Sequence, residues 1–265
     1  MLKIYQRLWQ VNWAETWQYR ANLLMYLLYW LVSPVVYLAV WTTIANSQGP
    51  VNGLTANDFT TYYMTLLIVD MLTSDIVIHI FAYKIQDGTL SGELIRSIHP
   101  VLTNTLITNL ANKALTFTAL IPVWGVLWFL FKPDFSSVTW QGVLMAAPAV
   151  ILGFAIGFLM SAAITCVAFW TTRVWALHEV YFGFVIMFSG QFVPLQLMPE
   201  MIQKTARFLP FQLFKYFPIE IILGRLSTGE IVQGYFSGVV WLIAAIFAFR
   251  WVWQSGVKKF SAVGA

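Results

Sequence analysis

The chain has 265 residues, of which 59% are hydrophobic and 10% are charged, and its formal net charge at pH 7 is +4. Soluble domains carry about 25% charged residues, so this composition excludes an ordinary soluble protein. A spanning helix needs about 20 mostly apolar residues whose backbone groups bond to one another, and the chain contains six such stretches. The sequence therefore predicts an all-α integral membrane protein.

Residues 1–21, which precede the first of these stretches, predict a helix that lies in the membrane interface. Trp9, Trp13 and Trp17 recur every four residues, so a helix places them on one stripe, with Lys3 and Arg7 on other faces. An ordinary juxtamembrane cap without a separate role is the alternative. Charged residues interrupt the apolar core that a cleaved signal peptide requires, so we expect the segment to stay on the protein.

We expect a single transmembrane domain over residues 1–265, with a six-span bundle at 22–253 and a cytoplasmic tail at 254–265. The predicted spans lie at about 22–45, 59–83, 104–131, 142–169, 177–197 and 231–253. With the N-terminus inside, ten of the 15 Lys and Arg residues fall on the cytoplasmic side. This excess favours two cytoplasmic termini.

The loop between the second and third spans predicts a two-turn amphipathic helix on the cytoplasmic side. Asp87 and Gly88 make a turn, Thr89 or Ser91 can cap the helix, and Pro100 ends it. Leu90, Leu94 and Ile98 recur every four residues and form an apolar ridge. Glu93 and Arg96 supply charges. We expect Glu93 and Arg96 to face away from the ridge. The ridge could lie on lipid or enter a groove of a partner protein.

Within this loop, the string Leu90-Ser91-Gly92-Glu93 resembles the start of the signature peptide of ATP-binding-cassette ATPases. Such an ATPase also needs a Gly-rich loop that ends in Gly-Lys-Ser or Gly-Lys-Thr, and the sequence contains no Gly-Lys pair. The match is therefore accidental, and the chain has no ATP-binding motif of its own.

Ionisable residues inside the spans form a second group of interest, because each costs about 2.5–3.5 kcal/mol at the middle of a membrane. The second span carries Asp70, Asp75 and His79, and a helix places the last two one turn apart, where they can pair. Lys113 in the third span and Glu179 at the start of the fifth could join them. These groups either join helices or form a polar lining of a transport path.

Residues 200–225 carry four of the five predicted outer cations, and closely spaced prolines in and before this region forbid one continuous helix there. We interpret this region as two short re-entrant amphipathic helices in the outer leaflet, whose Lys and Arg side chains snorkel to the interface. A seventh span is the alternative, and it would place the C-terminus outside.

Other classes of function leave weak signals. His178 and Glu179 begin a metalloprotease-like string, but Phe182 stands where the second His is required. Ser189 lacks the preceding Gly of a serine elbow, and Cys166 is the one cysteine. We therefore expect no catalytic residue and no metal site. A carrier driven by an ion gradient would suit the intramembrane acids, yet the internal repeats common in carriers are not evident.

In order and spacing, these features resemble the membrane permeases of type 2 ATP-binding-cassette exporters. The resemblance rests on the interfacial helix, the six spans, the "DGTLSGELIRSIHP" segment and the "SGQFVPLQLMP" break that ends the fifth span. It implies a half-transporter of the bacterial inner membrane that pairs with itself or a sister permease and contacts lipid but no nucleic acid. Separate ATPase subunits would bind ATP and Mg²⁺, and this chain would bind no cofactor.

The resemblance also implies roles for two segments. Gly88 to Pro100 would be the coupling helix that sits in a cleft of the ATPase, so its ridge and charges would transmit movement. Gly190, Gln191 and Pro194, at the outer end of the fifth span, would lie near the exit of the pathway and could act as a gate. Whether the substrate is a drug, a peptide, a lipid or a polysaccharide stays open.

Overall fold

The computed structural model describes residues 2–18, 20–96 and 98–260, and these residues are mostly helical. The α-helices are α1 (Leu2–Gln18), α2 (Arg20–Gln48), α3 (Ala56–Thr73), α4 (Val77–Gln86), α5 (Ser91–Leu94), α6 (Leu106–Phe131), α7 (Trp140–Thr165), α8 (Val174–Phe188), α9 (Glu200–Phe208), α10 (Tyr216–Ile222) and α11 (Thr228–Val257). A π-helix, η1, covers Pro100–Thr105, and 3-10 helices cover Cys166–Phe169 (η2), Leu195–Leu197 (η3) and Pro210–Leu213 (η4). No β-strand occurs in this described part, which confirms the all-α fold class.

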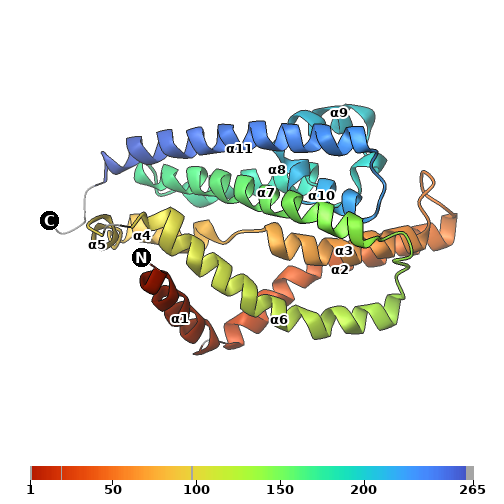
Figure 1. The fold of residues 1–265 in the computed structure, drawn as a ribbon, viewed down its shortest axis with the longest axis horizontal. Coiled ribbons are helices and arrows are strands. Elements are labelled where there is room, and N and C mark those ends of the chain that lie inside the picture. The colour runs from red at the N-terminus through yellow and green to blue at the C-terminus, as the bar shows by residue number, and fades with distance from the viewer. Residues whose placement is uncertain (1, 19, 97, 261–265) are drawn as a thin grey trace.

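The molecule is elongated, and its long helices run up and down the long axis (Figure 1). Helix α5, the beginning of α1 and the end of α11 lie at one end. The loops at 49–55 and 132–139 lie at the other end, and the short helices α9 and α10 lie toward it (Figure 1). The predicted interfacial helix, the predicted coupling segment and the last helix therefore meet at the same end of the molecule.

The described residues contain four helices long and apolar enough to cross a membrane: Ala56–Gln86, Pro100–Phe131, Trp140–Phe169 and Thr228–Val257. They correspond to the predicted second, third, fourth and sixth spans. Helix α2 covers the predicted first span with 29 residues, and α8 covers the start of the fifth with 15. The fifth stretch thus ends as a helix at Phe188, earlier than expected.

The second stretch is broken at residues 74–76, a feature that the sequence did not predict. Ser74 has extended backbone dihedrals (φ −67°, ψ 163°), which end α3. A break inside a membrane leaves carbonyl groups that must find partners. The Lys113 ammonium supplies them, because its Nζ donates to the backbone oxygen of Met71 at 2.8 Å and also to that of Ser74.

Close packing around α7 holds the bundle together. Gly153 faces η4 so closely that a Cβ atom at this position would lie 2.5 Å from the backbone oxygen of Leu213. Gly238 of α11 approaches Leu152 in the same way, at 2.3 Å. Small residues allow such helices to approach in a membrane, where lipid removes the hydrophobic force between them.

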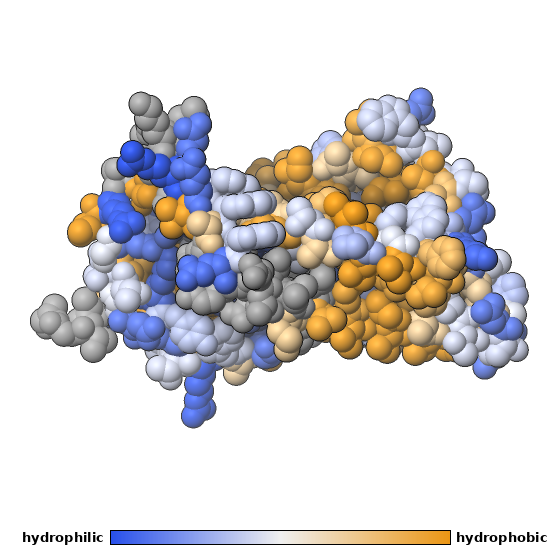
Figure 2. Space-filling model, turned by 90° about the horizontal axis from the view of Figure 1, so that it is seen from below, coloured by the Kyte–Doolittle hydropathy of each residue, from blue (hydrophilic) through white to orange (hydrophobic). Residues whose placement is uncertain are grey.

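Hydrophobic residues form a broad band on the face in Figure 2, and hydrophilic residues gather toward both ends of the long axis. Many large apolar side chains of the long helices are exposed, among them Phe129, Ile151 and Phe247. Such a surface suits hydrocarbon rather than water. Trp9 and Trp13 of α1 stack at a centroid distance of 6.2 Å and stay partly exposed, as an interfacial helix requires.

Candidate coupling segment and buried polar groups

The loop after α4 is a sharply folded turn. Asp87 ends α4, and Gly88 takes a left-handed conformation (φ +74°) that glycine adopts without strain. The backbone N–H of Leu90 then donates to the oxygen of Lys84 at 2.9 Å. The predicted two-turn helix is wrong, because α5 is a single turn over Ser91–Leu94.

The predicted capping is also wrong. Leu90, not Thr89 or Ser91, is the N-cap residue of α5, and its side chain makes no capping hydrogen bond. The Ser91 hydroxyl instead donates to the backbone oxygen of Gly88 at 2.8 Å, so it tightens the turn rather than the helix.

The apolar ridge faces inward, whereas the sequence predicts it either on lipid or in a groove of a partner. Leu90 is completely buried among Ile78, Phe81 and other core residues, and Leu94 packs against the same cluster. The exposed residues are different ones: Asp87, Thr89, Gly92, Ile95 and Arg96. We call these five residues the tip. Ile95 is 88% exposed, although the neighbouring residue Leu94 packs against the core.

Glu93 ties the tip to two helices. Its Oε1 accepts a hydrogen bond from Lys84 of α4 at 2.7 Å and another from Asn104 of η1 at 2.8 Å. The Lys84 and Glu93 side chains are only 21% and 15% exposed. Both bonds are charge-assisted and partly shielded from water, so they hold α5 at a defined angle.

The end of the segment is anchored as firmly as its beginning. The Nδ1 atom of His99 accepts from the backbone N–H groups of Val101 and Leu102, both at 3.2 Å, and so caps η1. The His99 ring lies 4.6 Å from the ring of Trp253 in α11. Burial lowers the pKa of His99, which favours the neutral ring that capping requires. Next to it, Pro100 is buried and Ile98 is half-buried.

Asp70 forms a buried ion pair with a residue that sequence reasoning placed elsewhere. Lys215, expected to snorkel to the outer interface, turns inward and pairs with Asp70, and the two side chains are 6% and 4% exposed. The Lys215 ammonium also donates to the Gln191 side-chain oxygen at 2.5 Å. The group thus joins α3, α10 and the break after α8.

Asp75 and His79 do not pair, because the break at residues 74–76 changes the helical phase between them. The Asp75 carboxylate accepts the N–H of Val77 at 3.1 Å and lies close enough to Lys113 for a charge interaction. Its neighbour Ser161 is also buried.

His79 and Glu179 belong to a separate group near the end where α5 lies. The His79 ring contacts those of Trp175 and His178 at centroid distances of 5.3 and 6.5 Å. Glu179 is exposed on α8 and interacts electrostatically with both histidines. The five predicted ionisable residues therefore form two groups rather than one, because Lys113 interacts with both Asp75 and Asp70 while His79 and Glu179 lie apart from them.

The predicted break after α8 is confirmed, and its backbone is tightly held. Gly190 has a φ of +80°, and its oxygen accepts from the Tyr62 hydroxyl at 2.8 Å. The Phe192 oxygen accepts from the Tyr63 hydroxyl at 2.8 Å. Pro194, which is buried, begins the short helix η3. Buried tyrosines thus satisfy carbonyl groups that the break would leave unpaired.

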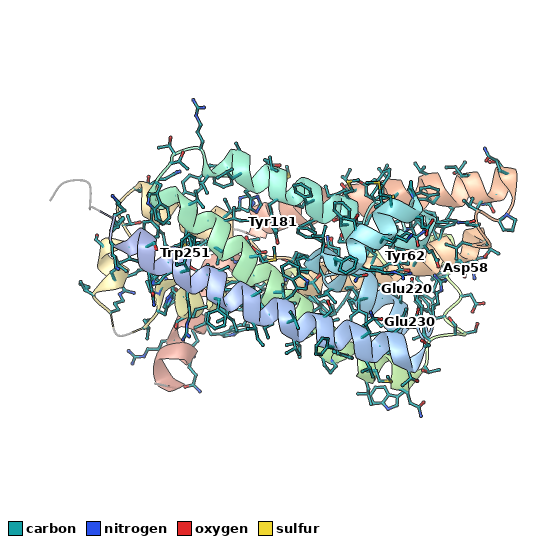
Figure 3. All side chains as sticks on the ribbon, turned by 90° about the horizontal axis from the view of Figure 1, so that it is seen from above. Asp58, Tyr62, Tyr181, Glu220, Glu230 and Trp251 are labelled. Atoms are coloured by element: carbon teal, nitrogen blue, oxygen red, sulfur yellow. The ribbon has the colours of Figure 1, made fainter. Side chains whose placement is uncertain are left out.

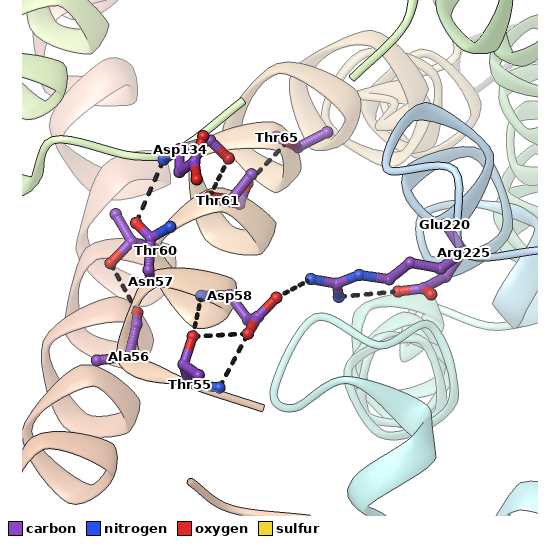
Figure 4. A network of polar contacts seen from close by, with 10 residues as sticks. All are labelled: Thr55, Ala56, Asn57, Asp58, Thr60, Thr61, Thr65, Asp134, Glu220 and Arg225. Atoms are coloured by element: carbon purple, nitrogen blue, oxygen red, sulfur yellow. Dashed lines mark hydrogen bonds and ion pairs between the residues drawn. The ribbon is translucent and has the colours of Figure 1, made fainter. Parts of the chain in front are cut away.

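A further network at the opposite end from the tip was not predicted. Asp58 caps the start of α3 together with Thr55, and it pairs with Arg225 at 2.8 Å (Figure 4). Arg225 also lies 3.8 Å from the buried Glu220 of α10 (Figure 4). Arg225, like Lys215, is therefore paired inside the protein. Two of the four cations that were expected to snorkel therefore pair with acidic residues of α3.

The geometry and the family comparison agree. A family model described as ABC-2 family transporter protein matches residues 31–264. The chain belongs to this family. A search of curated proteins finds no match to it. As an ABC-2 family member the protein is a multi-pass membrane protein and the permease subunit of an ABC transporter, and the family implies that separate ATPase subunits are its partners.

In this ABC-2 permease, two kinds of site are distinguishable. The tip is exposed, carries an acidic residue, a basic residue and an apolar side chain, and is anchored by the buried Leu90. The intramembrane acids Asp70 and Asp75 are engaged with residues of other helices, which favours the interpretation that they join helices. Sequence reasoning missed Lys215 and Arg225 because a cation in a short amphipathic segment gives no sign of whether it turns outward or inward.

Proposed function

We propose that the chain is one half of the membrane part of an ATP-driven exporter in a bacterial inner membrane. Two permeases, identical or sister subunits, would pair and bind two ATPase subunits that hold ATP and Mg²⁺. All six predicted spans would cross, with α1 lying in the interface against lipid and with α5 and both termini in the cytoplasm. The observation that supports this arrangement best is the tip, an anchored projection at the end where α1 begins and α11 ends (Figure 1).

The tip is proposed to couple the ATPase to the spans. Leu90 and Leu94 anchor it in the core, and Glu93 connects it to Lys84 of α4 and Asn104 of η1. A force on α5 would therefore reach the second and third spans directly. Through His99 and Trp253 it would also reach α11. Rigid attachment matters because a flexible loop would absorb the movement.

The test replaces exposed residues of the tip and leaves the anchoring residues Leu90, Glu93 and Leu94 unchanged. Ile95→Asp and Arg96→Glu should each reduce stimulation of the ATPase by the permease at least about tenfold, because charge introduced at an apolar contact or reversed at an interface costs about 1.4 kcal/mol or more. Met201→Asp is the matched control, since Met201 is 81% exposed but lies on α9, away from the tip. Wild-type stimulation by both tip variants would contradict the proposal.

The segment formed by Gly190, Gln191 and Pro194 is proposed to be an outer gate. Hydrogen bonds from Tyr62, Tyr63 and Lys215 to this segment would hold the gate closed. Opening would exchange these hydrogen bonds for contacts with substrate or water. Pro194→Ala should then alter export while ATPase assembly stays normal. Unchanged export would contradict a gating role.

Copurification separates this function from the alternatives. An ATPase that accompanies the chain through detergent extraction supports export driven by ATP. Uptake by the pure chain driven by an ion gradient would support a carrier instead, and substrate turnover by the pure chain would support an intramembrane enzyme.

A further inference from the structure

A cavity of about 240 Å³, lined by both polar and apolar side chains, opens at the end of the molecule opposite the tip. It lies between the short helices η3, α9 and η4 and the first turns of α11. Its polar lining includes Ser237, the charged residues Arg207 and Glu230, and four glutamines: Gln196, Gln203, Gln212 and Gln233. Figure 3 places Glu230 at the end of α11 far from Trp251, with Glu220 and Tyr62 nearby. No role in coupling or in the outer gate requires these residues.

Hydrogen-bonding groups in the cavity are oriented by the protein. The Gln203 side-chain nitrogen donates to the backbone oxygens of Met198 at 2.8 Å and of Gln196 at 3.2 Å, so this amide is fixed. The Gln196 Nε2 atom is buried and has no hydrogen-bond partner. A buried donor without a partner is unfavourable unless a ligand or water completes it.

The charges in the lining favour a neutral ligand. Arg207 and Glu230 line the same cavity and attract each other, so their charges offset. An anion would meet the Glu230 carboxylate and a cation would meet the Arg207 guanidinium. Side-chain amides both donate and accept hydrogen bonds, as hydroxyl groups do, so a lining rich in amides matches a hydroxyl-rich molecule.

Aromatic residues form part of the apolar wall of the cavity, together with Leu195 and Leu226. Tyr216 and Phe217 line it, and the Phe217 ring lies against Gly234, where a Cβ atom would be only 2.1 Å from the ring. Glycine at position 234 therefore lets the ring take its place in the wall. A flat apolar surface beside oriented polar groups is the combination that accommodates the C–H face and the hydroxyl groups of a sugar.

We propose that this cavity binds a neutral, hydroxyl-rich group about the size of one sugar ring. Pockets for drug-sized ligands measure about 300–1,000 Å³, so a cavity of about 240 Å³ suits a single ring rather than a chain of several. The group can come from a soluble saccharide or from the headgroup of a glycolipid in the adjacent leaflet. Binding here does not require that the tip couples to an ATPase, so the two proposals can fail separately.

The experiment measures binding to the full-length permease in phosphatidylcholine nanodiscs by saturation-transfer difference NMR. Methyl glucoside is the soluble probe, monoglucosyl diacylglycerol added to the nanodisc is the lipid probe, and inorganic phosphate is the anionic probe. We expect saturable binding of a glucoside probe and none of phosphate. Binding of the soluble probe identifies a saccharide site, and binding of the lipid probe alone identifies a headgroup site.

Three variants test the location. Gln233→Ala removes one amide from the lining and should weaken glucoside binding about tenfold, and Ser237→Leu fills the cavity and should abolish binding. Gln254→Ala is the matched control, an exposed glutamine at the other end of the same helix, and it should bind as the wild type does. A melting temperature within a few degrees of wild type, measured in the same nanodiscs, shows that each variant is folded.

Several outcomes would overturn the inference. These are the absence of saturable binding of both glucosides, preferential binding of phosphate, and equal binding of glucoside by the wild type and by folded Gln233→Ala and Ser237→Leu variants.

Discussion

Replacement of Lys215 by methionine should destabilise the protein strongly, because it leaves a buried carboxylate without its counter-ion. In the wild type, Lys215 pairs with Asp70 while both side chains are almost fully enclosed, at 6% and 4% exposure. Breaking a buried ion pair from one side typically costs about 3–5 kcal/mol. The Lys215→Met variant also deprives Gln191 of its hydrogen bond, so we place the loss at the upper part of that range.

The assay is unfolding of the purified permease in mixed micelles of dodecyl maltoside and SDS, followed by tryptophan fluorescence. The double variant Asp70→Asn with Lys215→Met should recover most of the loss, because it removes both charges together. Lys204→Met is the matched control. Its partner Glu200 is one helical turn away, both side chains are at least 68% exposed, and removal of the pair should cost less than about 1 kcal/mol. Equal losses for Lys215→Met and Lys204→Met would refute the reasoning.

Three further predictions concern the break, the cap and the base of the tip. Gly190→Ala should lower the free energy of unfolding by about 1–3 kcal/mol, because φ is +80° and the new Cβ would lie 2.7 Å from the Tyr62 hydroxyl. Gly183→Ala in α8, where a Cβ would meet no atom within 4 Å, should be nearly neutral in the same unfolding assay. Because the pKa of His99 is lowered in the folded protein, the unfolded chain binds a proton at His99 more readily than the folded protein does. The free energy of unfolding should therefore stay level above about pH 7 and fall as the pH drops below about 6.5. His99→Asn keeps a capping oxygen and should reduce that pH dependence; an unchanged profile would contradict the assignment. Glu93→Gln should lower the free energy of unfolding by about 1–2 kcal/mol and reduce ATPase stimulation while ATPase binding persists. Normal stimulation would show that the hydrogen bonds from Lys84 and Asn104 to Glu93 do not transmit force.

Most of the helical framework follows from the sequence, because long apolar stretches have only one way to satisfy their backbone groups in lipid. The apolar stretches place the starts of the third and fourth spans within a few residues of the observed ones, at Pro100 and after Thr139. The end of α8 was harder to place. The apolar run continues past Phe188, but buried tyrosine hydroxyls from α3 stabilise an unwound backbone there.

The candidate coupling segment shows where periodicity stops being informative. Leu90, Leu94 and Ile98 recur every four residues, and this spacing predicts a ridge without saying which way the ridge faces. The structure turns Leu90 and Leu94 into the core and exposes Ile95 instead. In so short a helix, tertiary contacts rather than helical propensity decide the orientation.

Side-chain pairing across distant segments could not be predicted from local pattern at all. Asp70 and Lys215 are far apart in sequence and meet only because α10, which follows Lys215, packs against α3. A signal was nevertheless available. An intramembrane acid needs a partner, and a cation on the disfavoured side of the membrane is a candidate for it.

The claim that the tip contacts an ATPase is tested most directly by cross-linking from Ile95. Cys166, the one natural cysteine, is buried, so Ile95→Cys and Met201→Cys variants in a Cys166→Ala background each carry one accessible thiol. After treatment of membranes that contain the permease and its ATPase with a short thiol-to-amine cross-linker, the account predicts a covalent adduct of the ATPase with Ile95→Cys and none with Met201→Cys. An adduct with Met201→Cys alone, or with neither variant although the ATPase copurifies, would contradict it.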